Sequence, residues 1–270
     1  MKSVKAIHIS PVKSLGLANP DAVHVGMKGI AEDRRLFLIN ARGRLLTQRE
    51  VPRLVQISAE YKTDPGWLRL AMPDGSIVEG PVEPGEPVIT RMWGRDVMGR
   101  VADGDWNSIL TGFCGEPVRL VRSDEAGQCY DEYPISLLSD ASVQGLNQLP
   151  GTGISFDSRR FRPNILIGGC EPHEEDTWLG AVIKIGEDLL LRVTARDPRC
   201  AITTHDPTTG EEDFDTPKLI ISYRPSDRAA YFGVYGIVEH PGLVSIGDTV
   251  TAGDTVTAGD PVTAPSIGSS

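Results

Sequence analysis

Near its middle the chain reads Ser158-Arg159-Arg160-Phe161-Arg162-Pro163-Asn164, and this stretch leads directly into the apolar residues 165–167. The apolar residues predict a strand, and three arginines crowd the segment before it. If that segment is extended, Arg160 and Arg162 point to the same side. Their planar guanidinium groups then suit a phosphate or a carboxylate. A solvated or salt-bridged pair facing the surplus acids is the competing interpretation, which composition slightly favours.

A second informative stretch covers residues 197–210, in which Cys200 follows Arg199 and soon precedes two threonines. A cation beside a thiol favours the thiolate, which is the form that attacks electrophiles or binds a soft metal. Free cysteines are, however, more often inert small hydrophobic residues in a core. The residues around Cys200 leave both interpretations open.

The composition argues against several classes of protein. With 270 residues, of which 40% are apolar and 24% charged, the chain can bury an ordinary core as one large or two small domains. It carries 27 Lys and Arg against 37 Asp and Glu, a net charge of −10. This acidic balance argues against a nucleic-acid binder, because such proteins neutralise phosphates with clustered cations.

The four cysteines, Cys114, Cys129, Cys170 and Cys200, show no paired spacing. A disulfide framework, a structural zinc site and a built-in iron–sulfur cluster are therefore not expected. No apolar run approaches the roughly 18–20 residues that span a bilayer. The first residues pass straight into an alternating strand pattern rather than a leader. We expect a cytoplasmic protein with no membrane partner and no nucleic-acid partner.

The hydrophobic pattern predicts a strand-rich chain with few short helices, punctuated by 29 Gly and 20 Pro. Residues 35–39 and 45–47 predict a hairpin. Short helices are expected over 105–113 and from Ser139, which offers an N-cap. The remaining predicted strands are residues 4–10, 55–61, 67–72, 76–78, 87–92, 118–121, 164–167, 182–185, 189–194, 219–223, 232–238 and 244–246.

The C-terminal end carries an internal repeat. The hexapeptide at 247–252 recurs at 253–258 and, with Pro261 in place of one residue, at 259–264. Three copies are too few for a β-helix and lack its larger apolar residues. We expect only the first copy to be packed, with residues 253–270 forming a disordered tail. A connecting loop near 122–134 divides the rest into domains at 1–122 and 123–252.

Common catalytic motifs are missing from the sequence. There is no G-x-S-x-G elbow, no G-x-G-x-x-G or G-x-x-x-x-G-K-[ST] phosphate loop, and no H-E-x-x-H pair. Hydrolase, dehydrogenase and NTPase functions therefore have no support. The acidic residues 171–176 fit a solvated loop as well as a metal site, and we interpret them as a loop.

Six ordered motifs resemble those of the MOSC proteins, which are named for the C-terminal domain of molybdenum cofactor sulfurase. Within them the chain is most similar to the mitochondrial amidoxime-reducing component and its bacterial relatives, over roughly residues 1–250. The resemblance implies an α+β, strand-rich fold, in which an N-terminal β-barrel-like domain packs against a MOSC β-barrel domain. The motifs are residues 10–14 (SPVKS), 32–35 (EDRR), 138–142 (LSDAS), 161–164 (FRPN), 199–200 with 203–210 (RC and TTHDPTTG), and 233–235 with 247–248 (GVY and GD).

The resemblance implies a molybdenum cofactor, a molybdopterin in its mononucleotide or dinucleotide form. In that family the cysteine that matches Cys200 is the protein thiolate bound to molybdenum, which agrees with the preference of such a metal for soft ligands. Cys200 and Tyr235 are the implied catalytic residues. The positions that match the family's cofactor-holding set are Lys13, Ser14, Arg34, Ser139, Arg162, Asn164, Pro198, Arg199 and Tyr235.

The matched residues suggest physical roles toward this cofactor. Lys13, Arg34 and Arg162 would neutralise the pterin phosphate. Ser139 would present a helix N-terminus, where free N–H groups and the helix dipole favour anions. Asn164 can donate and accept hydrogen bonds at the edge of the pterin ring.

Tyr235 would donate a hydrogen bond near the metal ligands, whereas Pro198 stands where the animal enzymes have a cofactor-contacting serine. The resemblance implies a molybdenum oxidoreductase that reduces N-hydroxylated compounds such as hydroxylamines and amidoximes. Electrons would come from separate flavin, iron–sulfur or haem proteins. The alternatives are a cofactor carrier or sulfur-transfer module that uses Cys200, and a β-barrel interaction module whose cysteine is merely buried.

Overall fold

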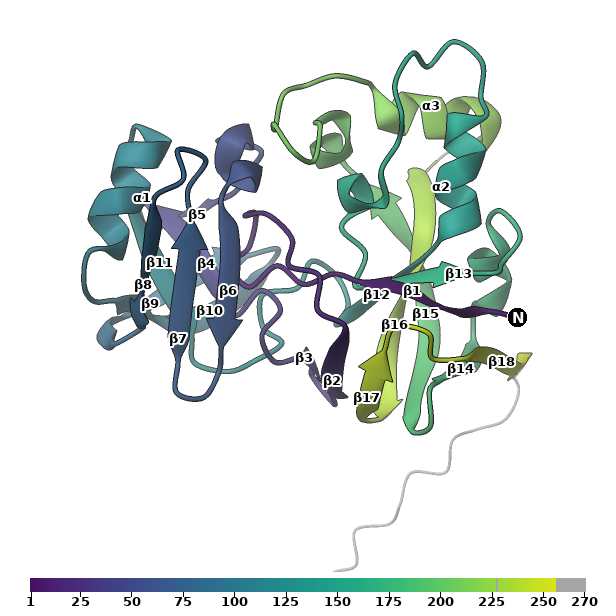
Figure 1. Cartoon of the computed structure of the whole chain (residues 1–270), viewed down its shortest axis with the longest axis horizontal. Coiled ribbons are helices and arrows are strands. Elements are labelled where there is room, and N and C mark those ends of the chain that lie inside the picture. Colours follow the sequence, from purple (N-terminus) through teal and green to yellow (C-terminus); the bar gives the residue numbers. More distant parts are fainter. Residues whose placement is uncertain (227, 256–270) are drawn as a thin grey trace, which may run out of the picture.

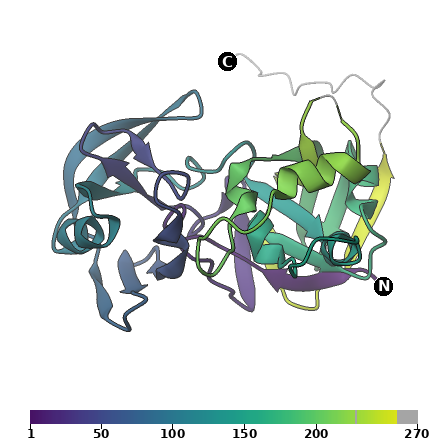
Figure 2. The ribbon, with the colours of Figure 1, turned by 90° about the horizontal axis from the view of Figure 1, so that it is seen from above.

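The computed structural model describes residues 1–226 and 228–255, which form two strand-rich bodies side by side (Figures 1 and 2). The first body contains a five-stranded sheet, in the order β5-β4-β11-β10-β9, and a three-stranded sheet, in the order β6-β7-β8. Its elements are β4 (Leu36–Asn40), β5 (Leu45–Leu46), β6 (Ser58–Lys62), β7 (Trp67–Ala71), β8 (Ile77–Pro81), β9 (Pro84–Met92), β10 (Arg95–Ala102), α1 (Trp106–Cys114) and β11 (Val118–Ser123).

The second body is built on a seven-stranded sheet in the order β1-β13-β12-β16-β15-β14-β18. Its first and last strands meet, because Ser3 bridges to Thr249 and the Val4 N–H donates to the Asp248 carbonyl at 2.9 Å. This contact almost closes the sheet into a barrel. The strands are β1 (Ser3–Ile7), β12 (Ile135–Ser139), β13 (Ile165–Gly168), β14 (Ala181–Ile185), β15 (Leu189–Arg199), β16 (Ala230–His240) and β18 (Val250–Thr255).

The start of the chain belongs in space to the second body. β1 pairs with β13, and β2 (Ala22–Gly26) lies between β3 (Gly29–Ile30) and β17 (Gly242–Ser245) in a small sheet. Figure 1 shows this purple segment passing across to the strands of the C-terminal half. The division at residue 122 therefore describes the order along the chain, and strand pairing crosses it.

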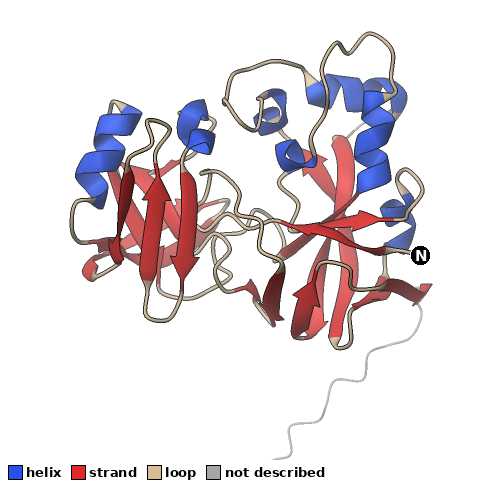
Figure 3. Ribbon diagram, viewed as in Figure 1, coloured by secondary structure: helices blue, strands red, loops and turns tan. Residues whose placement is uncertain are grey.

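Helices are few, as the pattern predicts, and they sit at the ends of the two bodies (Figure 3). Besides α1, the described residues contain two more α-helices, α2 (Asp140–Asn147) and α3 (Thr216–Tyr223). None of the helices in these residues is long and apolar enough to cross a membrane. Short 3₁₀ helices cover Pro52–Gln56, Ser158–Phe161, Glu174–Trp178 and Ala201–Thr204.

The strand predicted over residues 219–223 is wrong, because this segment is the second half of α3. The Asp215 side chain accepts a hydrogen bond from the Lys218 N–H at 3.1 Å and caps the helix, and Pro217 stands in its first turn. Both features favour a helix start. The apolar residues that follow pack on one side only, with Ile220 buried and Ile221 exposed.

Other local expectations are confirmed. Residues 36–46 form the predicted hairpin, in which Leu38 pairs with Leu46. The helix predicted over 105–113 lies one residue later. The expectation that only the first repeat copy is packed is wrong for residues 253–255, because β18 continues to Thr255, which pairs with Ala181 of β14. The rest of the predicted tail, residues 256–270, lies outside the described residues.

Each body has its own hydrophobic core. In the first body, buried leucines of β4, β7 and β11 pack against Trp106 and Leu110 of α1. In the second, isoleucine, leucine and valine side chains fill the barrel. A separate cluster under α2 and α3 joins Phe161 to Phe232, with ring centroids 4.5 Å apart. The two bodies therefore do not share one continuous core.

Two glycines with the same backbone angle test the packing of the barrel. Gly233 in β16 and Gly75 in the β7–β8 turn both have φ +86°, but a Cβ on Gly233 would lie 2.7 Å from the Leu137 carbonyl oxygen, whereas one on Gly75 would meet nothing within 4 Å. We expect Gly75→Ala to lower the free energy of unfolding by roughly 1–2 kcal/mol, the cost of left-handed backbone. Gly233→Ala should cost at least about 3 kcal/mol, because a backbone clash is added. Urea unfolding measures both, and equal losses would contradict this packing.

Candidate functional site

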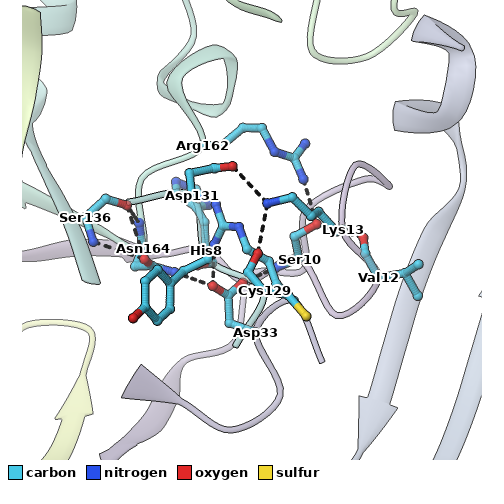
Figure 4. A network of polar contacts seen from close by, with 12 residues as sticks. His8, Ser10, Val12, Lys13, Asp33, Cys129, Asp131, Ser136, Arg162 and Asn164 are labelled. Atoms are coloured by element: carbon cyan, nitrogen blue, oxygen red, sulfur yellow. Dashed lines mark hydrogen bonds and ion pairs between the residues drawn. The ribbon is translucent and has the colours of Figure 1, made fainter. Parts of the chain in front are cut away.

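A buried carboxylate links three distant segments beside the gap between the bodies (Figure 4). Asp33, in the β3–β4 loop, accepts a hydrogen bond from the Ser10 N–H at 2.7 Å and from the Asn164 side-chain amide at 3.0 Å. It also forms an ion pair with Arg34. Because a buried charge is costly unless it is paired and hydrogen-bonded, this carboxylate holds together the segment after β1, its own loop and the residue before β13.

The amide of Asn164 is engaged at both ends. Its oxygen accepts hydrogen bonds from the Ser136 N–H at 3.0 Å and from the Ser136 hydroxyl at 3.1 Å, while its nitrogen donates to Asp33. Asn164 is 2% exposed. The structure therefore uses this side chain to anchor the segment that carries Arg162, a role the sequence analysis did not anticipate.

Lys13 is buried and does not line the cavity between the two bodies. Its ammonium group donates to the Asp131 carboxylate at 2.8 Å and to the Cys129 carbonyl at 2.9 Å. Burial, reinforced by Arg34, lowers the pKa of Lys13. Although desolvation opposes its charged form, Lys13 and Arg34 hold the pKa of Asp131 well below its ordinary value. Asp131 thus stays charged and compensates these cations.

Arg162 is compensated less well than its neighbours. Its backbone is left-handed, with φ +51°, and one guanidinium nitrogen donates to the Ser10 hydroxyl at 2.6 Å and to the Leu15 carbonyl at 2.8 Å. Within the described residues no carboxylate lies within ion-pair distance of it. Desolvation and the like charge of Arg34 lower the pKa of Arg162 to about 10. An anion placed here would relieve both effects.

Arg160 has a different role, and the expectation of an extended segment is wrong. Residues 158–161 form a 3₁₀ helix, because the Asp157 side chain accepts a hydrogen bond from the Arg159 N–H at 2.8 Å and caps it. Arg160 is buried and donates twice to Asp213, at 2.7 and 2.6 Å. This bidentate pair neutralises Arg160. Of these two arginines, only Arg162 is therefore available to a ligand.

Cys200 is exposed and directly follows β15. The cation beside its thiol is Arg49, whose guanidinium nitrogen lies 3.2 Å from Sγ. The neighbouring Arg199 points elsewhere, donating to the Phe232 carbonyl at 2.7 Å and the Phe161 carbonyl at 2.8 Å. The thiol therefore meets a positive charge, but one supplied by the first body rather than by its neighbour in sequence.

A buried acid lies close to this thiol in sequence. Asp197 is 2% exposed and forms an ion pair with Arg199 at 2.8 Å. Burial raises the pKa of Asp197 to about 7, against the opposing effects of Arg199 and of a hydrogen bond from Tyr235. Burial and Asp197 together also raise the pKa of Tyr235. This pair can hold protons at neutral pH.

Arg34, Arg162 and Cys200 line one cavity of about 370 Å³ between the two bodies. Five arginines line it against three carboxylates, so it is basic within a chain of net charge −10. The sequence-predicted residues that the structure brings to its wall are Arg34, Arg162, Asn164, Pro198, Arg199, Cys200 and Tyr235.

Three predicted residues do not reach the cavity wall. Lys13 and Ser14 are buried behind it. Ser139 begins α2 as predicted, but its hydroxyl makes no cap, and its N–H donates to the buried Glu175 carboxylate at 3.3 Å. The Ser142 hydroxyl donates to the same carboxylate at 2.9 Å. Because Glu175 already occupies this helix N-terminus, the structure does not direct it at the cavity.

Several lining residues were missed by sequence reasoning. Arg49 and Trp93 come from the first body, and no local pattern marks them. Tyr130, Asp131 and Tyr133 lie in the connecting loop, where a cluster of acidic and aromatic side chains was a signal that could have been used. Within the residues that the structure describes, no group of three or more His, Cys, Asp or Glu side chains is placed to hold a metal ion.

Comparisons with known proteins cover nearly the whole chain. The family model of the MOSC N-terminal beta barrel domain matches residues 1–117, and that of the MOSC domain matches residues 124–251. Mitochondrial amidoxime-reducing component 1 of Mus musculus is 31% identical, over 91% of this chain and 81% of its own. Mitochondrial amidoxime reducing component 2 of Bos taurus is 30% identical, over 91% and 82%. Among solved structures, the YUAD protein from Bacillus subtilis is 13% identical with a TM-score of 0.44, over 93% of this chain and 94% of that one.

The raised pKa of Asp197 can be observed directly. We expect a protonated carboxyl band in the infrared spectrum that disappears with a midpoint near pH 7, and that is missing from Asp197→Asn. Because the folded pKa exceeds the ordinary value of 3.8, this group adds stability at low pH and loses it as pH rises toward 7. A band in the wild type that has already vanished at pH 5 would contradict the burial of this acid.

Proposed function

Since the chain belongs to the family of MOSC-domain proteins that includes the mitochondrial amidoxime-reducing components, we propose that it is a molybdenum-cofactor-dependent reductase of N-hydroxylated compounds. The observation that carries this proposal is the exposed thiol of Cys200 in a basic cavity whose Arg162 has no carboxylate partner among the described residues. Such a cavity suits an anionic ligand that also carries a soft metal.

The cations of the cavity fit the phosphate of a pterin cofactor. Arg162 has unused donors on its guanidinium group and lies next to Arg34, so a phosphate bound between them would separate two like charges. Arg34 keeps its own charge, because Asp33 and Asp131 raise its pKa despite burial. We therefore assign the phosphate to these two arginines. Asn164 supports them through Asp33, to which its amide donates and with which Arg34 is paired.

Cys200 would supply the protein ligand to the metal. A pterin dithiolene brings sulfur ligands of its own, so one protein thiolate is sufficient. Arg49, 3.2 Å from Sγ, would offset the negative charge of that thiolate. When bound, the cofactor supplies the two-electron chemistry that removes oxygen from a hydroxylated nitrogen.

The chain's own residues would handle protons. Reducing an N-hydroxyl group to an amine and water consumes two protons and two electrons. Of the acids in the cavity wall, Asp197 has its pKa raised to about 7, so its carboxyl can carry a proton at neutral pH. Tyr235 keeps its hydroxyl proton, because its pKa is raised by burial and by Asp197, and it donates a hydrogen bond to that carboxyl. The electrons would come from separate redox proteins.

Metal content tests this proposal. Protein purified from a host that makes the cofactor should contain molybdenum, and Cys200→Ser should lose most of it. Cys114→Ser, at a half-buried cysteine outside the cavity, is the matched control and should keep it. Elemental analysis reads the metal, and reduction of a hydroxylamine by dithionite with a viologen reads the activity.

Two results would count against the reductase. Wild-type protein without molybdenum would remove the cofactor. Molybdenum bound without reduction of any N-hydroxylated compound would instead favour a carrier or a sulfur-transfer module that uses Cys200.

Salt dependence tests the role of Arg162. Arg162→Ala should weaken cofactor retention roughly tenfold or more at low salt, because a charge-assisted contact is lost. The difference from wild type should shrink as salt rises, because salt screens the attraction between Arg162 and the anion that only the wild type has. Tyr235→Phe, which removes no charge, should show a difference that does not depend on salt. Retention measured by cofactor fluorescence after gel filtration decides, and an Arg162→Ala loss that is equal at all salt concentrations would mean that Arg162 only packs.

A further inference from the structure

An unusual turn contributes Trp93 to the wall of the cavity. β9 and β10 are joined by only two residues, Trp93 and Gly94, because Met92 pairs directly with Arg95. Both loop residues have positive φ, +48° for Trp93 and +84° for Gly94. A two-residue loop of this kind strongly prefers Asn, Asp or Gly at its first position. A tryptophan there is disfavoured, because its Cβ and ring crowd a left-handed backbone.

Core packing does not account for this tryptophan. Trp93 is 44% exposed and belongs to none of the hydrophobic clusters of the described residues. A strained backbone that carries an exposed aromatic side chain points to a function rather than to stability. Trp93 lines the same cavity as Cys200, although it comes from the other body.

One guanidinium group connects the indole ring to the thiol. The Arg49 Cζ atom lies 4.7 Å from the centre of the Trp93 ring, and the Nη2 nitrogen of the same guanidinium group lies 3.2 Å from Cys200 Sγ. The Lys13 ammonium lies 5.7 Å from the same ring centre. These cation–π contacts hold the ring beside the position at which the reaction would occur.

The cavity that Trp93 lines has other aromatic side chains in its wall. Three of the chain's six tyrosines, Tyr130, Tyr133 and Tyr235, line the cavity, and the Tyr133 and Tyr235 ring centroids are 5.7 Å apart. Only 6% of the chain is aromatic, so this cavity takes a large share of it. Aromatic walls bind flat apolar groups by stacking and by edge contacts.

We propose that Trp93 is a substrate-positioning residue, which with Tyr130 and Tyr133 selects N-hydroxylated substrates that carry an aryl or similarly flat substituent. This inference rests on the proposed function and deepens it. The flat substituent lies against the aromatic wall, and the N–OH group is thereby directed toward Cys200. The first body thus contributes specificity to a site whose other parts come mainly from the second body.

The test compares two amidoximes with the same reacting group. Benzamidoxime carries a phenyl ring and acetamidoxime carries a methyl group. Trp93→Asn removes the indole and places the favoured residue in the turn, Trp93→Phe restores an aromatic ring, and Trp67→Thr removes an exposed tryptophan that does not line the cavity. The cofactor-loaded protein is used, with calorimetric binding, KM and kcat measured for each compound and a reduced viologen as electron donor.

Trp93→Asn should raise Kd and KM for benzamidoxime roughly three- to tenfold, and should leave Kd and KM for acetamidoxime within about twofold. Trp93→Phe should recover part of the loss, and Trp67→Thr should behave like wild type. The melting temperature of Trp93→Asn should be unchanged or higher, since Asn-Gly suits this turn.

Three results would overturn the role of Trp93. These are equal changes in KM for the two compounds, no change for benzamidoxime, or a lower melting temperature of Trp93→Asn that accounts for the loss. Wild-type protein that reduces neither compound would refute the proposed function instead, and the calorimetric contrast between the two compounds would still decide what Trp93 binds.

Discussion

The buried carboxylate of Asp33 is the constraint on which the site depends. It can be buried only because Ser10, Arg34 and Asn164 meet it with hydrogen bonds and charge. These partners lie in the segment after β1, in the loop before β4 and just before β13. The hydrogen bonds and the ion pair of one carboxylate therefore bring three distant segments together. Arg162 stands two residues before Asn164, and its place beside Arg34 follows from that anchor.

Charge compensation around this anchor is uneven. Arg160 is neutralised by Asp213, and Lys13 by Asp131, whereas Arg162 relies on a hydroxyl and a carbonyl oxygen. Because Arg160 has a carboxylate partner and Arg162 has none among the described residues, positive charge remains in this cavity although the chain as a whole is acidic. The anionic ligand that we propose would complete this arrangement, because it would supply the negative charge that Arg162 lacks among the described residues.

The sequence predicted what depends on local pattern and on ordered motifs, and it failed where long-range contacts decide. Alternation of apolar residues was enough for most strands, but at residues 219–223 the cap from Asp215 outweighed β-branched composition. Motifs predicted roles for Cys200 and Arg162, and the structure places both in the wall of one cavity. Arg49, which supplies the cation at the thiol from 151 residues away, and Trp93, which sits in an atypical turn, carry no local signal. At Ser139 the sequence predicted the start of the helix correctly but not its partner. The Ser139 N–H donates to the Glu175 carboxylate, so it does not face a ligand.

The most direct measurement is a crystal structure of the chain purified with its bound cofactor. We expect the cofactor inside the cavity between the two bodies, with its phosphate within hydrogen-bonding distance of Arg34 and Arg162. We also expect a bond between the metal and Cys200 Sγ. A cofactor phosphate held at the N-terminus of α2 beside Ser139, or a metal with no bond to Cys200, would contradict it.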